Sequence, residues 1–99
     1  MSDFSIGGKK WPGISKLIEE MGEVAQVCGK LIGSRGEENH WDGTNLRRRL
    51  EDELADLTAA IRFVQQSNGL NANAIADRAR VKLILFDGWH DSEQRREGK

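Results

Sequence analysis

The sequence predicts an all-α protein, a bundle of three main helices per chain that is completed by oligomerisation. Apolar residues recur at three- and four-residue spacings in three segments, and polar turn-rich segments, with no β-strand pattern, separate them. The length of 99 residues limits the chain to a single domain, 1–99, with a modest core. Because three helices with broad apolar arcs cannot bury all of their apolar surface in so small a subunit, we expect a homodimer or a tetramer.

The first two helices have the clearest period. The first is predicted over residues 14–32, after an irregular, glycine-containing lead-in over 1–13, and Gly33 is its stop signal. The segment 33–44 is polar and rich in turn residues, so we expect a loop there. The second helix is predicted over 46–66 from a leucine-rich stripe at helical spacing.

The third helix has less certain ends in the sequence pattern. Asn71 or Asn73 is a suitable N-cap, and the apolar period runs to about Phe86. Asp87 and Gly88 then predict its end. The tail 91–99 is almost wholly charged and is expected to be frayed.

Composition excludes several classes of protein. The formal net charge is −1 and the pI is near 6.1, which argues against a nucleic-acid or membrane-surface partner. Cys28 is the single cysteine, so an intrachain disulfide framework is excluded and a reducing compartment is favoured. No apolar run approaches a membrane span or a signal peptide, and we expect a cytoplasmic protein.

Acidic residues lie on the apolar faces of the first two predicted helices. On a helical wheel Glu20 lies inside the apolar arc of the first helix, and Glu53 lies inside that of the second. Glu23 lies just outside its arc, and Asp56 lies at the edge of its own. A buried carboxylate without a partner costs several kcal/mol on the order found in real proteins, so a cation must lie beside these acids.

That cation is either a basic side chain or a metal ion. Two acid pairs on facing helices would form a ring of hard oxygen ligands, which suits Mg²⁺ or Mn²⁺ and a bound phosphate. The rival interpretation is a set of structural salt bridges, since acid pairs at this spacing arise by chance in a helical chain with 16 acids. The position of the acids on the helices leaves both interpretations open.

The segments around the two pairs carry a family resemblance. Residues 19–25 read Glu-Glu-Met-Gly-Glu-Val-Ala, and residues 51–57 read Glu-Asp-Glu-Leu-Ala-Asp-Leu. They resemble the ExxE and ExxD motifs of the MazG-like all-α nucleoside triphosphate pyrophosphohydrolases. The resemblance covers about residues 11–86, with a longer spacing between the motifs than this family usually has.

The resemblance implies a helical bundle in which Glu20, Glu23, Glu53 and Asp56 hold Mg²⁺, with Mn²⁺ as a possible substitute. It implies cleavage of a nucleoside or deoxynucleoside triphosphate between the α and β phosphates, which gives a monophosphate and pyrophosphate. The pattern of the family favours Glu20 and Glu23 as the catalytic pair. Lys82 matches a lysine of the family, but the Asn and Arg that usually follow it are missing here.

Four further residues are candidates for substrate binding, each with a structural alternative. Lys82 lies in the apolar stripe of the third helix, as a phosphate contact or a partner of a core carboxylate. Arg49 is placed to pair with Glu53 one turn later, or to contact a triphosphate. Trp11 and Trp41 lie outside the predicted helices, where each ring either stacks on a base or fills the core.

Two other functions remain open at this point. One is phosphoribosyl-ATP pyrophosphohydrolase, a relative in the same superfamily with a different substrate. The other is a non-catalytic helical oligomer or partner-binding protein in which the acids serve only salt bridges.

Overall fold

The protein is all-helical. In the computed structural model, which describes residues 2–98, the helices are α1 (Ile14–Gly33), α2 (Leu46–Ser67) and α3 (Ala72–Glu97). No strand forms within this range, where one isolated bridge pairs Asn39 with Asn45. The predicted all-α class is therefore confirmed, and no helix of this part of the chain is both long and apolar enough to cross a membrane.

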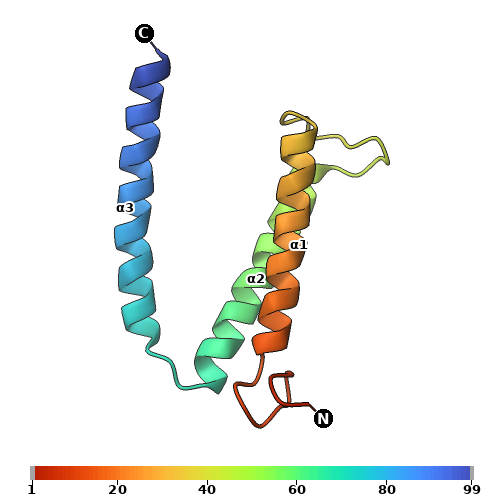
Figure 1. Cartoon of the computed structure of the whole chain (residues 1–99), viewed down its shortest axis with the longest axis vertical. Coiled ribbons are helices and arrows are strands. Elements are labelled where there is room, and N and C mark those ends of the chain that lie inside the picture. Colours follow the sequence, from red (N-terminus) through yellow and green to blue (C-terminus); the bar gives the residue numbers. More distant parts are fainter. Residues whose placement is uncertain (1, 99) are drawn as a thin grey trace.

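The helices α1 and α2 form an antiparallel pair that contains the core (Figure 1). Val27 of α1 is fully buried, and so is Leu46 at the start of α2. Ala60 and Val64 continue the buried stripe towards the other end of α2. Both helices begin where the apolar period predicts and end one residue beyond the predicted end.

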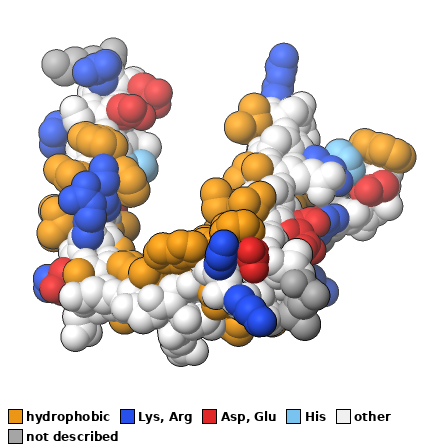
Figure 2. Space-filling view, turned by 60° about the horizontal axis from the view of Figure 1, so that its bottom comes forward, with side chains coloured by type: hydrophobic (Ala, Val, Ile, Leu, Met, Phe, Trp, Pro, Cys, Tyr) orange, Lys and Arg blue, Asp and Glu red, His pale blue; other side chains and the backbone are white. Residues whose placement is uncertain are grey.

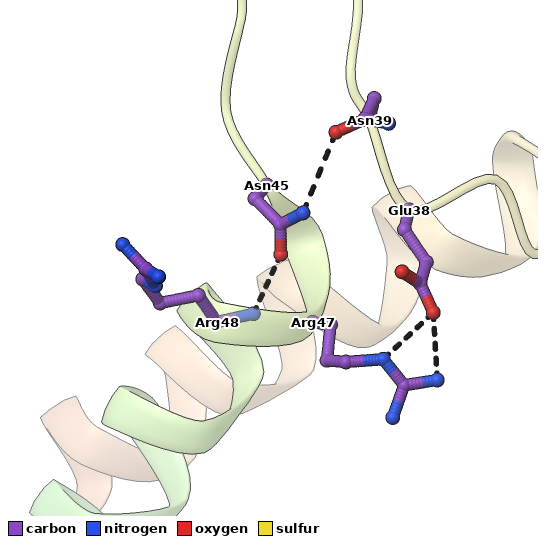
Figure 3. A network of polar contacts seen from close by, with 5 residues as sticks. All are labelled: Glu38, Asn39, Asn45, Arg47 and Arg48. Carbon is purple, nitrogen blue, oxygen red and sulfur yellow. Dashed lines mark hydrogen bonds and ion pairs between the residues drawn. The ribbon is translucent and has the colours of Figure 1, made fainter.

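The start of α2 is fixed by its N-cap and by the preceding loop (Figure 3). The Asn45 side chain accepts a hydrogen bond from the backbone N–H of Arg48 at 2.9 Å, which satisfies one free donor of the first turn. Basic residues are unfavourable at a helix N-terminus. Glu38 of the loop compensates one of them, because its Oε1 lies 2.6 Å from Nη2 of Arg47.

The third helix stands apart from the other two (Figure 1). No residue described in α3 is buried. The radius of gyration is 17.2 Å, compared with about 12.6 Å for a compact domain of this length. The accessible surface is 7868 Å², compared with about 5,700 Å² for a compact monomer of this mass.

The predicted end of the third helix is wrong. The helix passes through Asp87 and Gly88 without a break and ends at Glu97, so residues 91–97 are helical instead of frayed. A glycine inside a helix costs only about 1 kcal/mol relative to alanine. Good helix formers a turn or more away, Leu83 and Leu85 before Gly88 and residues 93–96 after it, outweigh this cost. Arg95 and Arg96 in the last turn also complement the helix dipole.

The N-terminal segment, residues 2–13, folds back against the end of α2. The Asn68 side chain donates a hydrogen bond to the carbonyl of Pro12 at 3.0 Å. Gly13 has a φ of 92°, and a Cβ there would lie 2.6 Å from Cδ1 of Phe63. Glycine is therefore required at this position for both its backbone conformation and its close approach to the ring.

Candidate metal centre

Three carboxylates from two helices converge on one point. Glu20 comes from α1, and Glu53 and Asp56 come from successive turns of α2, where residues three apart share a face. One oxygen of each group lies within 4.8 Å of the other two. The side chains of Glu20 and Glu53 are 14% and 13% exposed, whereas Asp56 is exposed.

The pKa of Glu20 reflects this crowding. Burial raises the pKa of its carboxyl above the ordinary value, and the negative charge of Asp56 raises it further. Lys16 acts in the opposite direction but is outweighed. The group is therefore held in an environment where its negative charge is only partly compensated.

Two basic side chains neutralise part of the cluster. The Nζ atom of Lys16 lies 3.9 Å from Oε1 of Glu20, one turn along α1. The Nε atom of Arg49 lies 3.3 Å from Oε1 of Glu53, as the spacing on α2 predicts. Within residues 2–98, no basic group lies within ion-pair distance of Asp56.

The fourth predicted ligand, Glu23, lies outside this group of three. Its Oε2 atom is 3.6 Å from Nη2 of Arg49, which therefore bridges α1 and α2 by contacting both Glu23 and Glu53. The side chain of Glu23 is 40% exposed, in line with its predicted place just outside the apolar arc.

An open recess adjoins the carboxylates. Its volume is about 320 Å³. The residues that line it come from α1, from α2 and from the N-terminal segment: Ile6, Lys16, Glu20, Asp56, Ala59, Ala60 and Phe63. The sequence analysis did not single out Phe63, although it lies two helical turns after Asp56 on the same face of α2. No sequence pattern near Ile6 predicts that it lines the recess, because only the fold-back of the N-terminal segment brings Ile6 to this place.

The remaining predicted substrate contacts lie elsewhere in a single chain. Lys82 is exposed on α3, where its Nζ atom lies 5.9 Å from the ring centroid of Phe86 on the same helix. Trp41 is 89% exposed. Trp41 lies in the loop that follows α1, and the end of α1 is about 20 Å from Glu20 along the helix axis, at a rise of 1.5 Å per residue. Trp11 is half exposed and does not line the recess.

The arrangement offers hard oxygen donors beside an apolar recess. Carboxylate oxygens suit Mg²⁺ and Mn²⁺, and close negative charges are relieved when such an ion binds. Comparisons with protein-family models, curated proteins and solved structures find no match for this chain. The chemical interpretation therefore depends on the residues themselves.

Proposed function

We propose that the chain is a MazG-like, Mg²⁺-dependent nucleotide pyrophosphohydrolase. It cleaves a nucleoside or deoxynucleoside triphosphate between the α and β phosphates and releases a monophosphate and pyrophosphate. The convergence of Glu20, Glu53 and Asp56 from two helices carries the proposal, because these residues belong to the motifs that resemble the family.

The charge balance of the site supports a divalent ion. The four acids of the two motifs are accompanied by two cations, Lys16 and Arg49, and Lys16 lies closer to Glu19, at 3.3 Å, than to Glu20. At least two negative charges are therefore uncompensated. A single Mg²⁺ or Mn²⁺ supplies that charge. The ion pairs of Glu20, Glu23 and Glu53 favour a purely structural role for these acids. Two observations favour a bound cation: Asp56 has no ion pair within residues 2–98, and the pKa of Glu20 is raised.

Each residue has a role in this proposal. Glu20, Glu53 and Asp56 would hold the ion, which when bound would neutralise phosphate charge and orient a water for in-line attack. Glu20 and Glu23 are the candidates to accept the proton of that water. Arg49 contacts Glu23 and Glu53 at the border of the cluster. Its guanidinium could therefore leave one of these carboxylates and donate to a phosphate oxygen of the substrate instead.

The oligomer belongs to the same proposal. The chain exposes about 2,200 Å² more than a compact monomer would, an area within the range of obligate interfaces. Figure 2 shows hydrophobic side chains on both arms of the open molecule and along the floor between them. The exposed large hydrophobic residues of α3 and of the α1–α2 pair include Ile75, Leu83, Phe86, Trp89, Ile18, Met21, Leu54 and Ile61. In this proposal a second copy of the chain covers these hydrophobic residues, in a homodimer or a tetramer. The same assembly would bring Lys82 of one copy to the carboxylate cluster of the other.

A pyrophosphate-release assay tests the function. The common ribo- and deoxyribonucleoside triphosphates and phosphoribosyl-ATP are incubated with the protein, with Mg²⁺ or with EDTA, and the products are separated by chromatography. We expect a nucleoside monophosphate and pyrophosphate from the triphosphates only when Mg²⁺ is present. Cleavage of phosphoribosyl-ATP alone would assign the other enzyme of the superfamily. No cleavage of any compound would favour the non-catalytic oligomer.

We expect Mg²⁺ to stabilise the protein at pH 7.5 and to lose this effect in acid. The raised pKa of Glu20 means that its protonated form is favoured by folding. In the metal-free protein its contribution to stability is therefore full below its ordinary pKa and is lost as the pH rises through the raised value. Mg²⁺ acts in the opposite direction, because it binds the ionised carboxylates.

Thermal unfolding between pH 7.5 and 5.0, with Mg²⁺ or EDTA, measures this linkage. At saturating Mg²⁺ we expect a Tm at least about 5 °C higher at pH 7.5, and a smaller difference at each lower pH. The variant Glu20→Gln should show neither effect, and Glu51→Gln, an exposed acid of α2, should behave as the wild type. A Tm difference that does not change with pH would contradict this role of Glu20.

A further inference from the structure

The recess beside the carboxylates has two chemically different kinds of lining residue. Lys16, Glu20 and Asp56 provide charge, and the remaining lining is apolar: Ile6, Ala59, Ala60 and Phe63. A volume of about 320 Å³ lies at the lower limit of small-molecule sites. The occupant that fits is therefore small, with an anionic, cation-binding part and an apolar part.

The wall that carries Ile6 is held in place by the fold. The backbone N–H of Gly13 donates to the carbonyl of Ser5 at 2.9 Å, and that of Ser15 donates to the carbonyl of Phe4 at 2.9 Å. These bonds tie the residues before Ile6 to the start of α1. On the α2 side, the lining residues Ala59 and Ala60 are small, and the recess that they share with Ile6 and Phe63 is open.

The lining also lacks a feature that base-specific sites have. Among its seven residues there is no amide and no hydroxyl side chain, so no uncharged side chain of the lining can donate to or accept from the edge of a base. A site that hydrogen-bonds a group of its substrate rejects an analogue that lacks this group by about 10⁴-fold or more. An apolar pocket discriminates between substrates of different size by only about 10- to 200-fold. Stacking on an aromatic ring is tolerant of base identity.

We infer that this recess binds the base of the nucleotide, between Ile6 and the ring of Phe63, and that it selects bases by size rather than by hydrogen bonding. The inference rests on the proposed function, because the carboxylate cluster sets where the phosphates lie. It assigns Ile6, Ala59 and Phe63 as the residues that determine specificity.

Steady-state kinetics with a matched pair of variants provide the first test. Ala59→Leu fills the recess, and Ala55→Leu adds the same side chain one turn away, at an exposed position that does not line it. In the wild type we expect kcat/KM values for the common bases to lie within about 100-fold of one another. Ala59→Leu should lower kcat/KM at least about tenfold more for purine than for pyrimidine nucleotides, mainly through KM, and Ala55→Leu should not. A wider spread in the wild type, or equal effects of the two variants, would overturn the inference while leaving the pyrophosphohydrolase activity established.

A binding measurement without metal or turnover provides the second test. In protein with ¹³C-labelled isoleucine methyl groups, an added nucleoside monophosphate should give nuclear Overhauser effects from its base protons to the Ile6 methyl group. Ile75 on α3 serves as the internal reference and should give none. Effects absent from Ile6, or as strong at Ile75, would overturn the inference even if the triphosphates are cleaved. Failure of every triphosphate to be cleaved would instead remove the proposed function.

Discussion

Replacing Glu53 by Gln should lower pyrophosphate release by more than about 100-fold while the protein keeps its fold. The amide has nearly the shape of the carboxylate but neither its charge nor its affinity for a hard cation. Changes one shell further from a metal already cost about 10- to 100-fold, so loss of a direct ligand should cost more. We expect the same loss for Glu20→Gln and Asp56→Asn, measured as kcat at saturating Mg²⁺.

The metal-free forms of these variants should be at least as stable as the wild type. Each change removes one negative charge from a crowded cluster in which burial, and then the charge of Asp56, raise the pKa of Glu20. The repulsion among the remaining acids is therefore weaker. Thermal unfolding in EDTA at pH 7.5 measures this effect. Glu51→Gln removes an exposed charge of the same helix outside the cluster and should retain full activity. Lower stability together with lower activity would indicate that the acids serve structural salt bridges.

Replacing Phe86 by Asp should convert the proposed oligomer to a monomer of 11.1 kDa and lower the Tm by more than about 10 °C. Phe86 lies near the middle of α3 and belongs to its apolar stripe, yet it is 50% exposed in the single chain. A charge placed in the interface that covers this stripe would be buried without a partner, at a cost of several kcal/mol on the order expected for such groups. Sedimentation equilibrium and thermal unfolding measure the two effects.

Arg80→Asp is the matched control for the oligomer. It introduces the same side chain about 120° around α3 from Phe86, at 100° per residue, where Arg80 pairs with exposed Asp77. Surface changes of this kind usually alter stability by about 0.5 kcal/mol or less. We expect this variant to retain the mass of the wild-type oligomer. A wild-type chain that sediments as a monomer would contradict the proposal that a second copy covers α3.

Local signals predicted most of the helical structure. The positions of α1 and α2 follow from apolar period, from Asn45 as N-cap and from glycine near the helix ends, all of which act within a few residues. The end of α3 could not be read in this way. Gly88 is a stop signal in many sequences, but here the helical preference of the residues beyond it outweighs the modest cost of one glycine.

The part of the site that depends on which face of a helix a residue occupies could be predicted from the sequence. The phase placed Glu20 and Glu53 on faces that meet, and the structure places Asp56 with them. The contact between Glu23 and Arg49 depends on the relative position of two helices, which the period of each helix does not specify. The apolar recess was not predicted either, because Ile6 reaches it through long-range hydrogen bonds of the N-terminal segment.

The central claim is that Glu20, Glu53 and Asp56 bind one divalent cation. A crystal grown with Mn²⁺ and measured at the manganese absorption edge tests it most directly, since the anomalous signal locates the ion independently of activity. We predict one strong peak per chain between α1 and α2, with an oxygen of each of the three carboxylates coordinated to it. Density that leaves the three groups without an ion while Lys16 and Arg49 keep their present contacts would contradict the claim.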